Sequence, residues 1–273
     1  MSGSGHDPHA TDRLPTDPRR TDPRRTDSAG VPWAGRTLQP NAFAADDGSR
    51  APALAQALAA WRALTGGGAG GERTARLRAE AGVVAALAGT RVFAPVVAEL
   101  GELAADGGDK SADMALALLT QPDGRRALPL FTDLAALVAW RADARPVPVP
   151  AEQAALSGVQ EECDALVLDA AGPVRFVVRR SASWALARGL PWVPAALDPA
   201  VAAAAERAVE GLAAVRGVRC EPGEGAELRV VLGIVPGLRR AQLDEVLRTV
   251  GERLAEGPVA ERAESLEFRV LPA

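Results

Sequence analysis

Apolar residues at helical spacing open the first ordered part of the chain. Leu54, Leu58 and Trp61 recur every three or four residues and predict a helix over 51–64. The same spacing predicts a second helix over 72–88, after the glycine-rich segment "TGGGAGG". The second helix presents Leu77, Val84 and Leu87 on one side.

The next segments change to strand patterns. "RVFAPVVAEL" (91–100) is rich in β-branched residues, and its proline predicts a strand at the edge of a sheet. After an acidic, glycine-rich loop comes "MALALLTQPDGRRALPLFTDLAALVAW" (114–140). We interpret it as a buried strand, a Pro-Asp-Gly turn, a return strand and a helix capped by Thr132 or Asp133.

The plan then recurs. "ARPVPVP" (144–150) is predicted to be extended, because a residue before proline disfavours the helical conformation, and a helix follows over 151–162. "DALVLDAAGPVRFVVRR" (164–180) is again strand, turn and strand, and "SASWALARG" (181–189) predicts a serine-capped helix. The sequence therefore predicts two β-hairpin–helix units that contribute to one mixed sheet.

The C-terminal part has a different order of elements. A helix over 199–215 is followed by a strand ending near Cys220, a strand over 226–235, a helix over 238–256 and a last strand over 266–272. This order resembles most of a ferredoxin-like split unit. The predicted fold class is α+β: a mixed-sheet domain of β-hairpin–helix units, plus a small C-terminal α/β domain of ferredoxin-like type.

The N-terminal segment has no such pattern. Residues 1–32 are poor in apolar side chains and contain the repeat "TDPRRTDPRRTD", in which aspartate and arginine balance. A segment of this kind cannot bury enough surface to offset its ordering entropy, so we predict a disordered tail. The predicted division is a tail over 1–32, an α/β domain over 33–195 and a second domain over 196–273.

Composition and charge exclude several classes of partner. The formal net charge is −4, and the tail's arginines face equal numbers of aspartates, so we expect no binding of nucleic acid. The longest apolar window, 81–89, is too short for a bilayer, and no membrane association is expected. The two cysteines are far apart, which favours a reduced, cytoplasmic setting over a disulfide framework.

The residues that usually carry catalysis are scarce. Both histidines, His6 and His9, lie in the predicted tail, and the chain has no tyrosine. We therefore predict no catalytic residue, no metal site and no cofactor, and interpret the chain as a non-enzyme. Gly66, Gly68 and Gly71 satisfy G-x-G-x-x-G, but a helix precedes them where a dinucleotide site needs a strand, so we interpret a linker.

One cysteine keeps an enzymatic alternative open. Cys220 in "CEPGEGA" could present a thiolate for sulfur transfer if nearby charge lowered its pKa. Glu221 and Glu224 would raise that pKa instead, and a structural role for a cysteine at a strand end is the simpler interpretation. Cys163 is expected to be a small core residue.

The predicted contact surface centres on the turn of the first hairpin. Arg125 and Arg126 follow Asp123 there, and strand alternation sends neighbouring side chains to opposite faces, so at least one arginine should face solvent. Lys110, in the preceding loop, and Trp192, beside a proline in a nonhelical segment, complete the candidate binding residues.

The run from Asn41 to Pro194 resembles the SseB family, named for enhanced serine sensitivity. The resemblance rests on "NAFAADDGS", "RVFAPVV", "KSADMALALLTQPDGRRALPLFTDLAALVAW" and "SWALARGLPWVP", and 199–273 looks like the region that accompanies the domain in actinobacterial members. It implies a cytoplasmic α/β module, loosely associated with serine sensitivity and sulfurtransferase neighbours, and it brings no catalytic residue. The leading hypothesis is a non-enzymatic module that binds a protein or ligand and has a regulatory role; sulfur transfer through Cys220 is the alternative.

Overall fold

A computed structural model describes residues 43, 45–64, 70–99 and 113–273. The predicted disordered tail over 1–32, Lys110 and most of the predicted loop 101–113 lie outside the described residues. Residues 1–45 and 46–273 are separate units.

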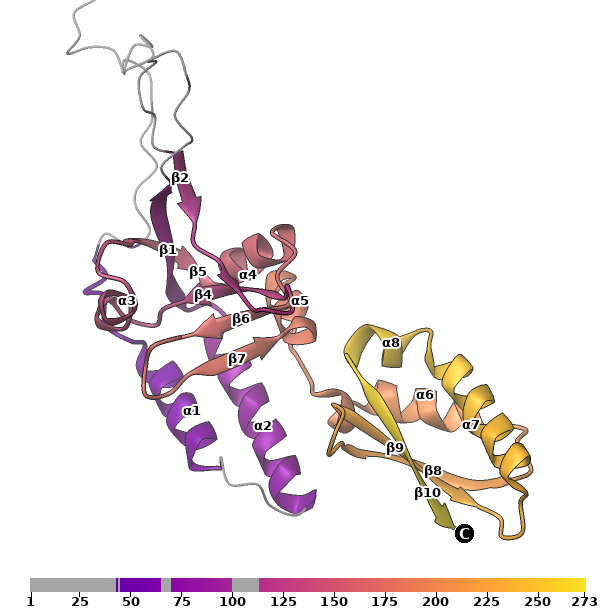
Figure 1. The fold of residues 1–273 in the computed structure, drawn as a ribbon. Coiled ribbons are helices and arrows are strands. Elements are labelled where there is room, and N and C mark those ends of the chain that lie inside the picture. The colour runs from indigo at the N-terminus through magenta and orange to yellow at the C-terminus, as the bar shows by residue number, and fades with distance from the viewer. Residues whose placement is uncertain (1–42, 44, 65–69, 100–112) are drawn as a thin grey trace, which may run out of the picture. The chain divides into compact units, whose positions relative to one another are not determined.

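Between residues 52 and 187 the elements follow the predicted order, except that one predicted strand is divided into β2 and β3 (Figure 1). They are α1 (Pro52–Ala63), α2 (Gly70–Leu87), β1 (Arg91–Glu99), β2 (Asp113–Leu116), β3 (Leu119–Thr120), β4 (Arg126–Leu130), α3 (Leu134–Trp140), β5 (Arg145–Pro150), α4 (Ala151–Gln160), β6 (Ala165–Leu168), β7 (Phe176–Arg179) and α5 (Arg180–Ala187). The α+β class is confirmed.

Two hairpins make up a four-stranded mixed sheet of order β3-β4-β6-β7. Strands β3 and β4 are antiparallel, as are β6 and β7, whereas β4 and β6 run parallel and join the hairpins. The prediction that two β-hairpin–helix units share one mixed sheet is thus confirmed. We call the parallel pairing of β4 with β6 the seam between the hairpins. Because these two strands run in the same direction, their carboxyl ends lie side by side.

A second sheet has the order β2-β1-β5, and it corrects the prediction for 91–100. Strand β1 is the central strand and not an edge, although it contains Pro95. The N–H and C=O of Phe93 bond to Phe131, so the odd-numbered residues of β1 turn their polar groups away from β5. Pro95 faces Pro146 of β5 in that register, at a pair that exchanges no hydrogen bonds. Proline is tolerated there because no donor is needed.

The same register explains the prolines of β5. Pro146, Pro148 and Pro150 all pair with odd-numbered residues of β1, so their nitrogens lie on the outer side of this edge strand. The outer edge therefore lacks donors at every second position, which hinders pairing with another strand.

The predicted strand "MALALLT" is two strands in two sheets. Strand β2 pairs with β1, the N–H of Ala117 still bonds to the carbonyl of Pro95, and β3 then pairs with β4. A continuous apolar run does not reveal at which residue the chain leaves one sheet for the other, so the single predicted strand was wrong.

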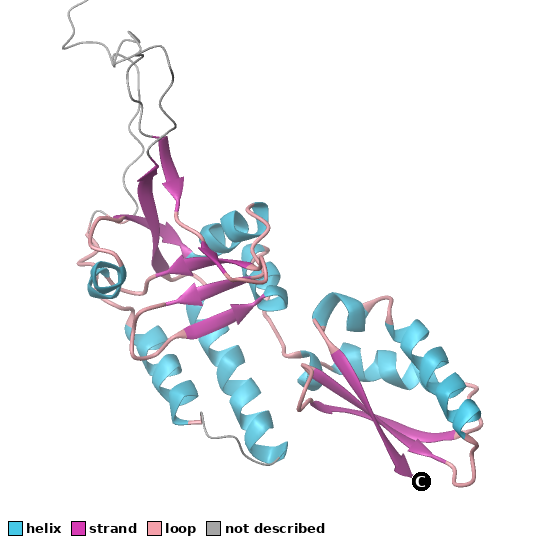
Figure 2. Cartoon of the chain, viewed as in Figure 1, coloured by secondary structure: helices cyan, strands magenta, loops and turns pink. Residues whose placement is uncertain are grey.

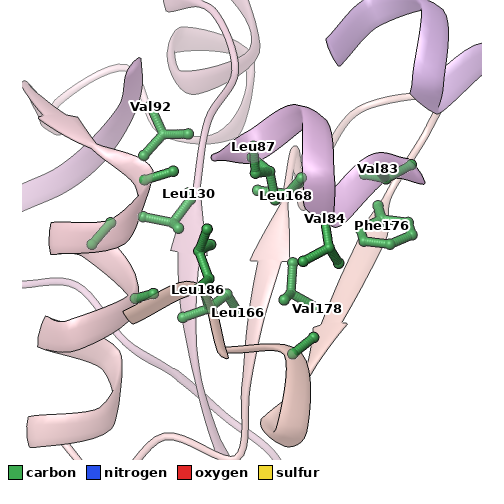
Figure 3. Close-up of a cluster of buried hydrophobic side chains, with 14 of the residues drawn as sticks. Val83, Val84, Leu87, Val92, Leu130, Leu166, Leu168, Phe176, Val178 and Leu186 are labelled. Atoms are coloured by element: carbon green, nitrogen blue, oxygen red, sulfur yellow. The ribbon is translucent and has the colours of Figure 1, made fainter. Parts of the chain in front are cut away.

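One face of the four-stranded sheet carries the core (Figures 2 and 3). The buried side chains from the strands are Leu128, Leu130, Leu166, Leu168, Phe176 and Val178. Helices α1 and α2 contribute Leu54, Leu58, Val83, Val84 and Leu87, and α4 and α5 contribute small residues and Leu186. Gly158 of α4 lies directly over the seam, where a Cβ would come within 2.7 Å of Leu166. The alternate residues of β4, β6 and β7 are left for the opposite face.

The C-terminal part contains η1 (Ala195–Leu197), α6 (Pro199–Val209), β8 (Val215–Pro222), β9 (Leu228–Ile234), α7 (Arg240–Leu254), α8 (Pro258–Arg262) and β10 (Leu266–Pro272). Its sheet has the order β10-β9-β8, with β9 antiparallel to β8 and parallel to β10. This order is compatible with the predicted ferredoxin-like resemblance, although β9 and β10 are direct neighbours. The predicted domain boundary at 195/196 stays a prediction.

Candidate functional site

The sheet face opposite the core lines a groove, which we name the arginine groove. Ala127 of β4, Ala165 and Val167 of β6, and Val177 of β7 are alternate strand residues that line it. Trp184 of α5 adds an aromatic side chain that is 45% exposed, and Val177 is 49% exposed. The groove therefore exposes Val177 and Trp184 to solvent above a floor of small and apolar side chains.

Arginines surround this apolar floor. Within residues 46–195 the groove is lined by six arginines and two acidic residues, a net charge of +4. The arginines are Arg76, Arg125, Arg126, Arg175, Arg179 and Arg180, and the acids are Glu80 and Asp164. The whole chain has a net charge of −4, so the groove differs in sign from the protein average.

Three of the five predicted binding residues lie at one end of this groove or beside it. The Arg125 guanidinium is 62% exposed and its Nε donates to Asp123 Oδ2 at 2.7 Å. Arg126 donates through its guanidinium to the carbonyl of Glu161, and its backbone N–H donates to Asp164 at 3.0 Å. Both arginines keep some exposure, but each is already engaged within its own domain.

Arg175 and Arg180 are the arginines that sequence reasoning left out of the candidate site. Both are exposed, and neither forms a hydrogen bond or ion pair with another residue in the part of the chain that the structure describes. The sequence does contain a difference between the two turns that indicates which arginine is unpaired. Asp123 stands two residues before Arg125, whereas Pro173 stands two residues before Arg175. The second turn therefore supplies no carboxylate to its arginine.

Trp192 does not line the groove. Its side chain packs against the core, and its Nε1 donates to Ser181 Oγ of α5 at 3.2 Å. Trp192 therefore links the segment after α5 to that helix. Ser181 itself is not a helix cap, which corrects the predicted serine cap. Helix α5 has Arg179 as its N-cap without a side-chain bond, and the Oγ of Ser183 donates to backbone carbonyls of β7.

A second polar cluster, which we name the strand-end cluster, lies where β4 and β6 end. The carboxylate of Asp169 accepts from the N–H of Thr132 at 2.9 Å and from its hydroxyl at 2.7 Å. Arg50 donates to Thr132 Oγ1 at 2.6 Å and to the carboxylates of Asp133 and Asp169 at 3.0 and 2.9 Å. Asp133 also caps α3 by accepting from the N–H of Ala136, which confirms the predicted cap.

Asp169 is the unusual member of the strand-end cluster. It is buried, and its backbone has a φ of +49°, a region that residues other than glycine rarely adopt. Burial raises the pKa of its carboxyl, while the hydrogen bonds from Thr132 and the charge of Arg50 act in the opposite direction. The sequence showed only a strand ending in aspartate, so nothing in it indicated that Arg50, 119 residues earlier, is the partner.

Neither cysteine has the surroundings of a reactive thiol. Burial raises the pKa of Cys220 to about 11, with a further contribution from Glu206. Burial also raises the pKa of Cys163. The predicted direction for Cys220 is therefore correct, but the cause is burial within β8 and not the neighbouring Glu221 and Glu224.

Comparison with known families identifies the domain. Residues 54–185 match the family model described as the SseB protein N-terminal domain. The chain carries an SseB domain. The match runs from α1 to α5 and includes both hairpins and the six arginines of the groove named above. No curated protein and no solved structure matches the chain.

The predicted resemblance is thus confirmed for the SseB domain, while the actinobacterial-type region over 199–273 stays a prediction. Within the described residues, no helix has the length and apolar content needed to cross a membrane. The same residues contain no group of three or more histidine, cysteine or acidic side chains placed to hold a metal ion.

Proposed function

We propose that this SseB-domain protein is a cytoplasmic, non-enzymatic binding module with a regulatory role, and that an acidic protein partner docks in the arginine groove. The observation that carries the proposal is the pair Arg175 and Arg180, two exposed arginines that have no acidic partner among the described residues and lie beside the exposed Val177 and Trp184. A partner carboxylate meeting either arginine would replace no ion pair that the described residues form.

The composition of the groove supports protein binding over other roles. Arginine and tryptophan are enriched among residues that dominate binding energy, because each combines a large contact area with a polar group. Small residues such as Ala127 and Ala165 leave room above the sheet for an incoming side chain. Two of the carboxylates that line the groove are engaged, Glu80 with Arg179 and Asp164 with the N–H of Arg126.

The proposal is tested by purifying the tagged full chain from its native cell and quantifying co-purifying proteins by mass spectrometry. Arg175→Ala/Arg180→Ala should abolish recovery of the partner, and Arg125→Ala/Arg126→Ala should reduce it. All four residues are exposed or half-exposed, so we expect melting temperatures close to that of the unmodified chain.

Matched controls exist on the same domain. Arg188 is exposed, has no partner among the described residues and lies outside the groove. Arg141 pairs with Asp143 two residues away, as Arg125 does with Asp123, and also lies outside it. Arg141→Ala/Arg188→Ala should leave recovery unchanged. Equal recovery from all four proteins would refute docking in the arginine groove.

Sulfur transfer through Cys220 is the alternative, and the thiol's burial weighs against it. With a pKa of about 11, the thiolate fraction at pH 7 is on the order of one in ten thousand. Alkylation of Cys220 by iodoacetamide should therefore be slow at pH 7 and rise through pH 9 without levelling off. A plateau below pH 8, together with a gain of one sulfur after incubation with a persulfide donor, would favour the sulfur-transfer hypothesis.

A further inference from the structure

Strand β10 forms one edge of the C-terminal sheet, whose order is β10-β9-β8. No strand among the described residues pairs with its outer side. The N–H and C=O groups along such an edge can pair with a strand of another chain. Strand β5 of the SseB domain is also an edge, but its prolines remove the outer donors, whereas the only proline of β10 is its last residue, Pro272.

The hydrogen bonding to β9 shows which backbone groups of β10 face outward. The N–H of Ala273 donates to the carbonyl of Ile234 in β9, at 2.9 Å. Successive residues of a strand turn their N–H and C=O groups to opposite sides, so the odd-numbered residues of β10 bond to β9. Three even-numbered residues therefore point both groups away from the sheet: Leu266, Phe268 and Val270.

These three residues also carry apolar side chains. Leu266 and Phe268 pack against the core of the C-terminal part, on the sheet face that its helices cover. Val270 is 37% exposed. A strand placed alongside β10 would cover Val270 and would pair with the outward N–H and C=O groups. Addition of a strand to a sheet edge draws on both contributions, because main-chain hydrogen bonds give affinity and alternate side chains give specificity.

We propose that β10 pairs antiparallel with β10 of a second copy of this chain, about a two-fold axis at Phe268. Phe268 then faces Phe268 of the second copy, and Leu266 faces Val270. Each of the outward N–H and C=O groups of these residues finds a partner, and Pro272 lies beyond the paired stretch. An interface of this kind is self-complementary and closed, as expected of a symmetric dimer. The proposal does not depend on the partner that we propose for the arginine groove.

Charge on the other face of the sheet selects this register. It places Arg269 opposite Glu267 of the second copy, and the two-fold axis repeats the pair. Moving the axis by one residue in either direction would oppose two Arg269 or two Glu267 side chains, and like charges directly opposite each other are destabilising. The register centred on Phe268 therefore pairs unlike charges where its neighbours pair like charges.

Both members of the charge pair have capacity for it. Arg269 is exposed and forms no ion pair or hydrogen bond with another side chain in the described part of the chain. Glu267 accepts from Arg229 and from the N–H groups of Glu224 and Gly225. A carboxylate has about four acceptor positions, so one is left for Arg269 of the second copy.

The test combines sedimentation velocity of the full chain at increasing concentration with amide hydrogen exchange of the ¹⁵N-labelled chain, followed by NMR. One strand pair buries less surface than a standard interface, so we expect a dimer whose fraction rises with concentration. The N–H groups of Leu266, Phe268 and Val270 should exchange at least tenfold more slowly as the dimer forms. Those of Glu267 and Arg269 point toward β9 and should be protected at every concentration. A chain that stays monomeric, or a dimer in which the three outward N–H groups exchange as in the monomer, would overturn the proposal.

Two matched variants test the register. Arg269→Glu places a carboxylate opposite Glu267 at both symmetry-related pairs, and it should raise the dissociation constant of the dimer at least tenfold. Arg216→Glu makes the same change of charge at an exposed arginine of β8, the other edge strand of the sheet, and should alter the constant less than twofold. Circular dichroism checks that both variants are folded. Equal dissociation constants for the two variants would show that β10 is not the interface.

Discussion

The two hairpins of the four-stranded sheet share a plan but differ in the charge that their turns expose. Arg125 directly precedes β4 and Arg175 directly precedes β7, so they occupy equivalent places. Asp123 lies 2.7 Å from the first arginine, and no described carboxylate bonds to the second. Similar hairpin geometry therefore produces one neutralised arginine and one that is available to a partner.

The contacts within each hairpin also differ from the contacts between the two hairpins in how far apart along the chain their residues lie. Each hairpin is held by local pairing, but the two are joined by parallel pairing of β4 with β6 and by the strand-end cluster beyond it. Those contacts link residues far apart in sequence, so they form only once the chain has brought both units together. The seam should therefore be more sensitive to substitution than either turn.

The largest expected effect is the loss of Asp169. Asp169→Ala removes the acceptor for two donors of Thr132 and one of Arg50, and it places alanine at a positive φ. Breaking a buried charged pair from one side costs about 3–5 kcal/mol, and because Arg50 keeps Asp133 we expect about 3 kcal/mol of unfolding free energy to be lost. Urea denaturation followed by circular dichroism measures this.

Asp169→Asn separates charge from backbone strain. Asparagine tolerates the left-handed conformation and can still accept from Thr132, so this variant should lose less than the alanine variant. If both variants unfold at the same urea concentration as the unmodified chain, the strand-end cluster does not hold the hairpins together.

A smaller effect is expected at the helix above the seam. Gly158→Ala would place a Cβ 2.7 Å from Leu166, with Leu128 of the other hairpin also in contact. Overpacking of this kind costs about 1–3 kcal/mol. Gly82→Ala is the matched control, because Gly82 also lies within a helix and a Cβ there meets nothing within 4 Å.

The two glycine variants should move stability in opposite directions. Alanine at Gly82 should stabilise the chain by about 0.5–1 kcal/mol, since alanine is the better helix former. Thermal or urea unfolding of the pair measures the difference. Equal stability of both variants would contradict the close approach of α4 to the seam.

The contrast between turns and seam also explains what could be predicted. Turn residues such as Pro122 and Asp123, the cap at Asp133 and the periodicity of α1 act locally, and they located the helices and both hairpins. The parting of β2 from β3, the central place of β1 and the Arg50–Asp169 pair depend on which segments become neighbours. A single sequence does not carry that information.

Only part of the groove was predicted from the sequence, namely Arg125 and Arg126. Arg175 and Trp184 were missed, because only the folded arrangement of strands and helices brings them beside those two residues.

The smallest expected effect concerns the turns themselves and makes the first hairpin resemble the second. The backbone N–H and guanidinium of Arg125 lower the pKa of Asp123, so this carboxylate stays ionised at neutral pH and neutralises its arginine. Asp123→Asn keeps an oxygen for the backbone bond but removes the charge. Affinity for a fluorescein-labelled hexaglutamate probe, measured by fluorescence anisotropy at low salt, should rise about two- to fivefold.

Asp143→Asn is the matched control, because it frees Arg141 in the same way outside the groove and should leave the affinity for the probe unchanged. An equal rise in both variants would show that the probe senses net charge alone, and the distinction between the two turns would then carry no functional meaning.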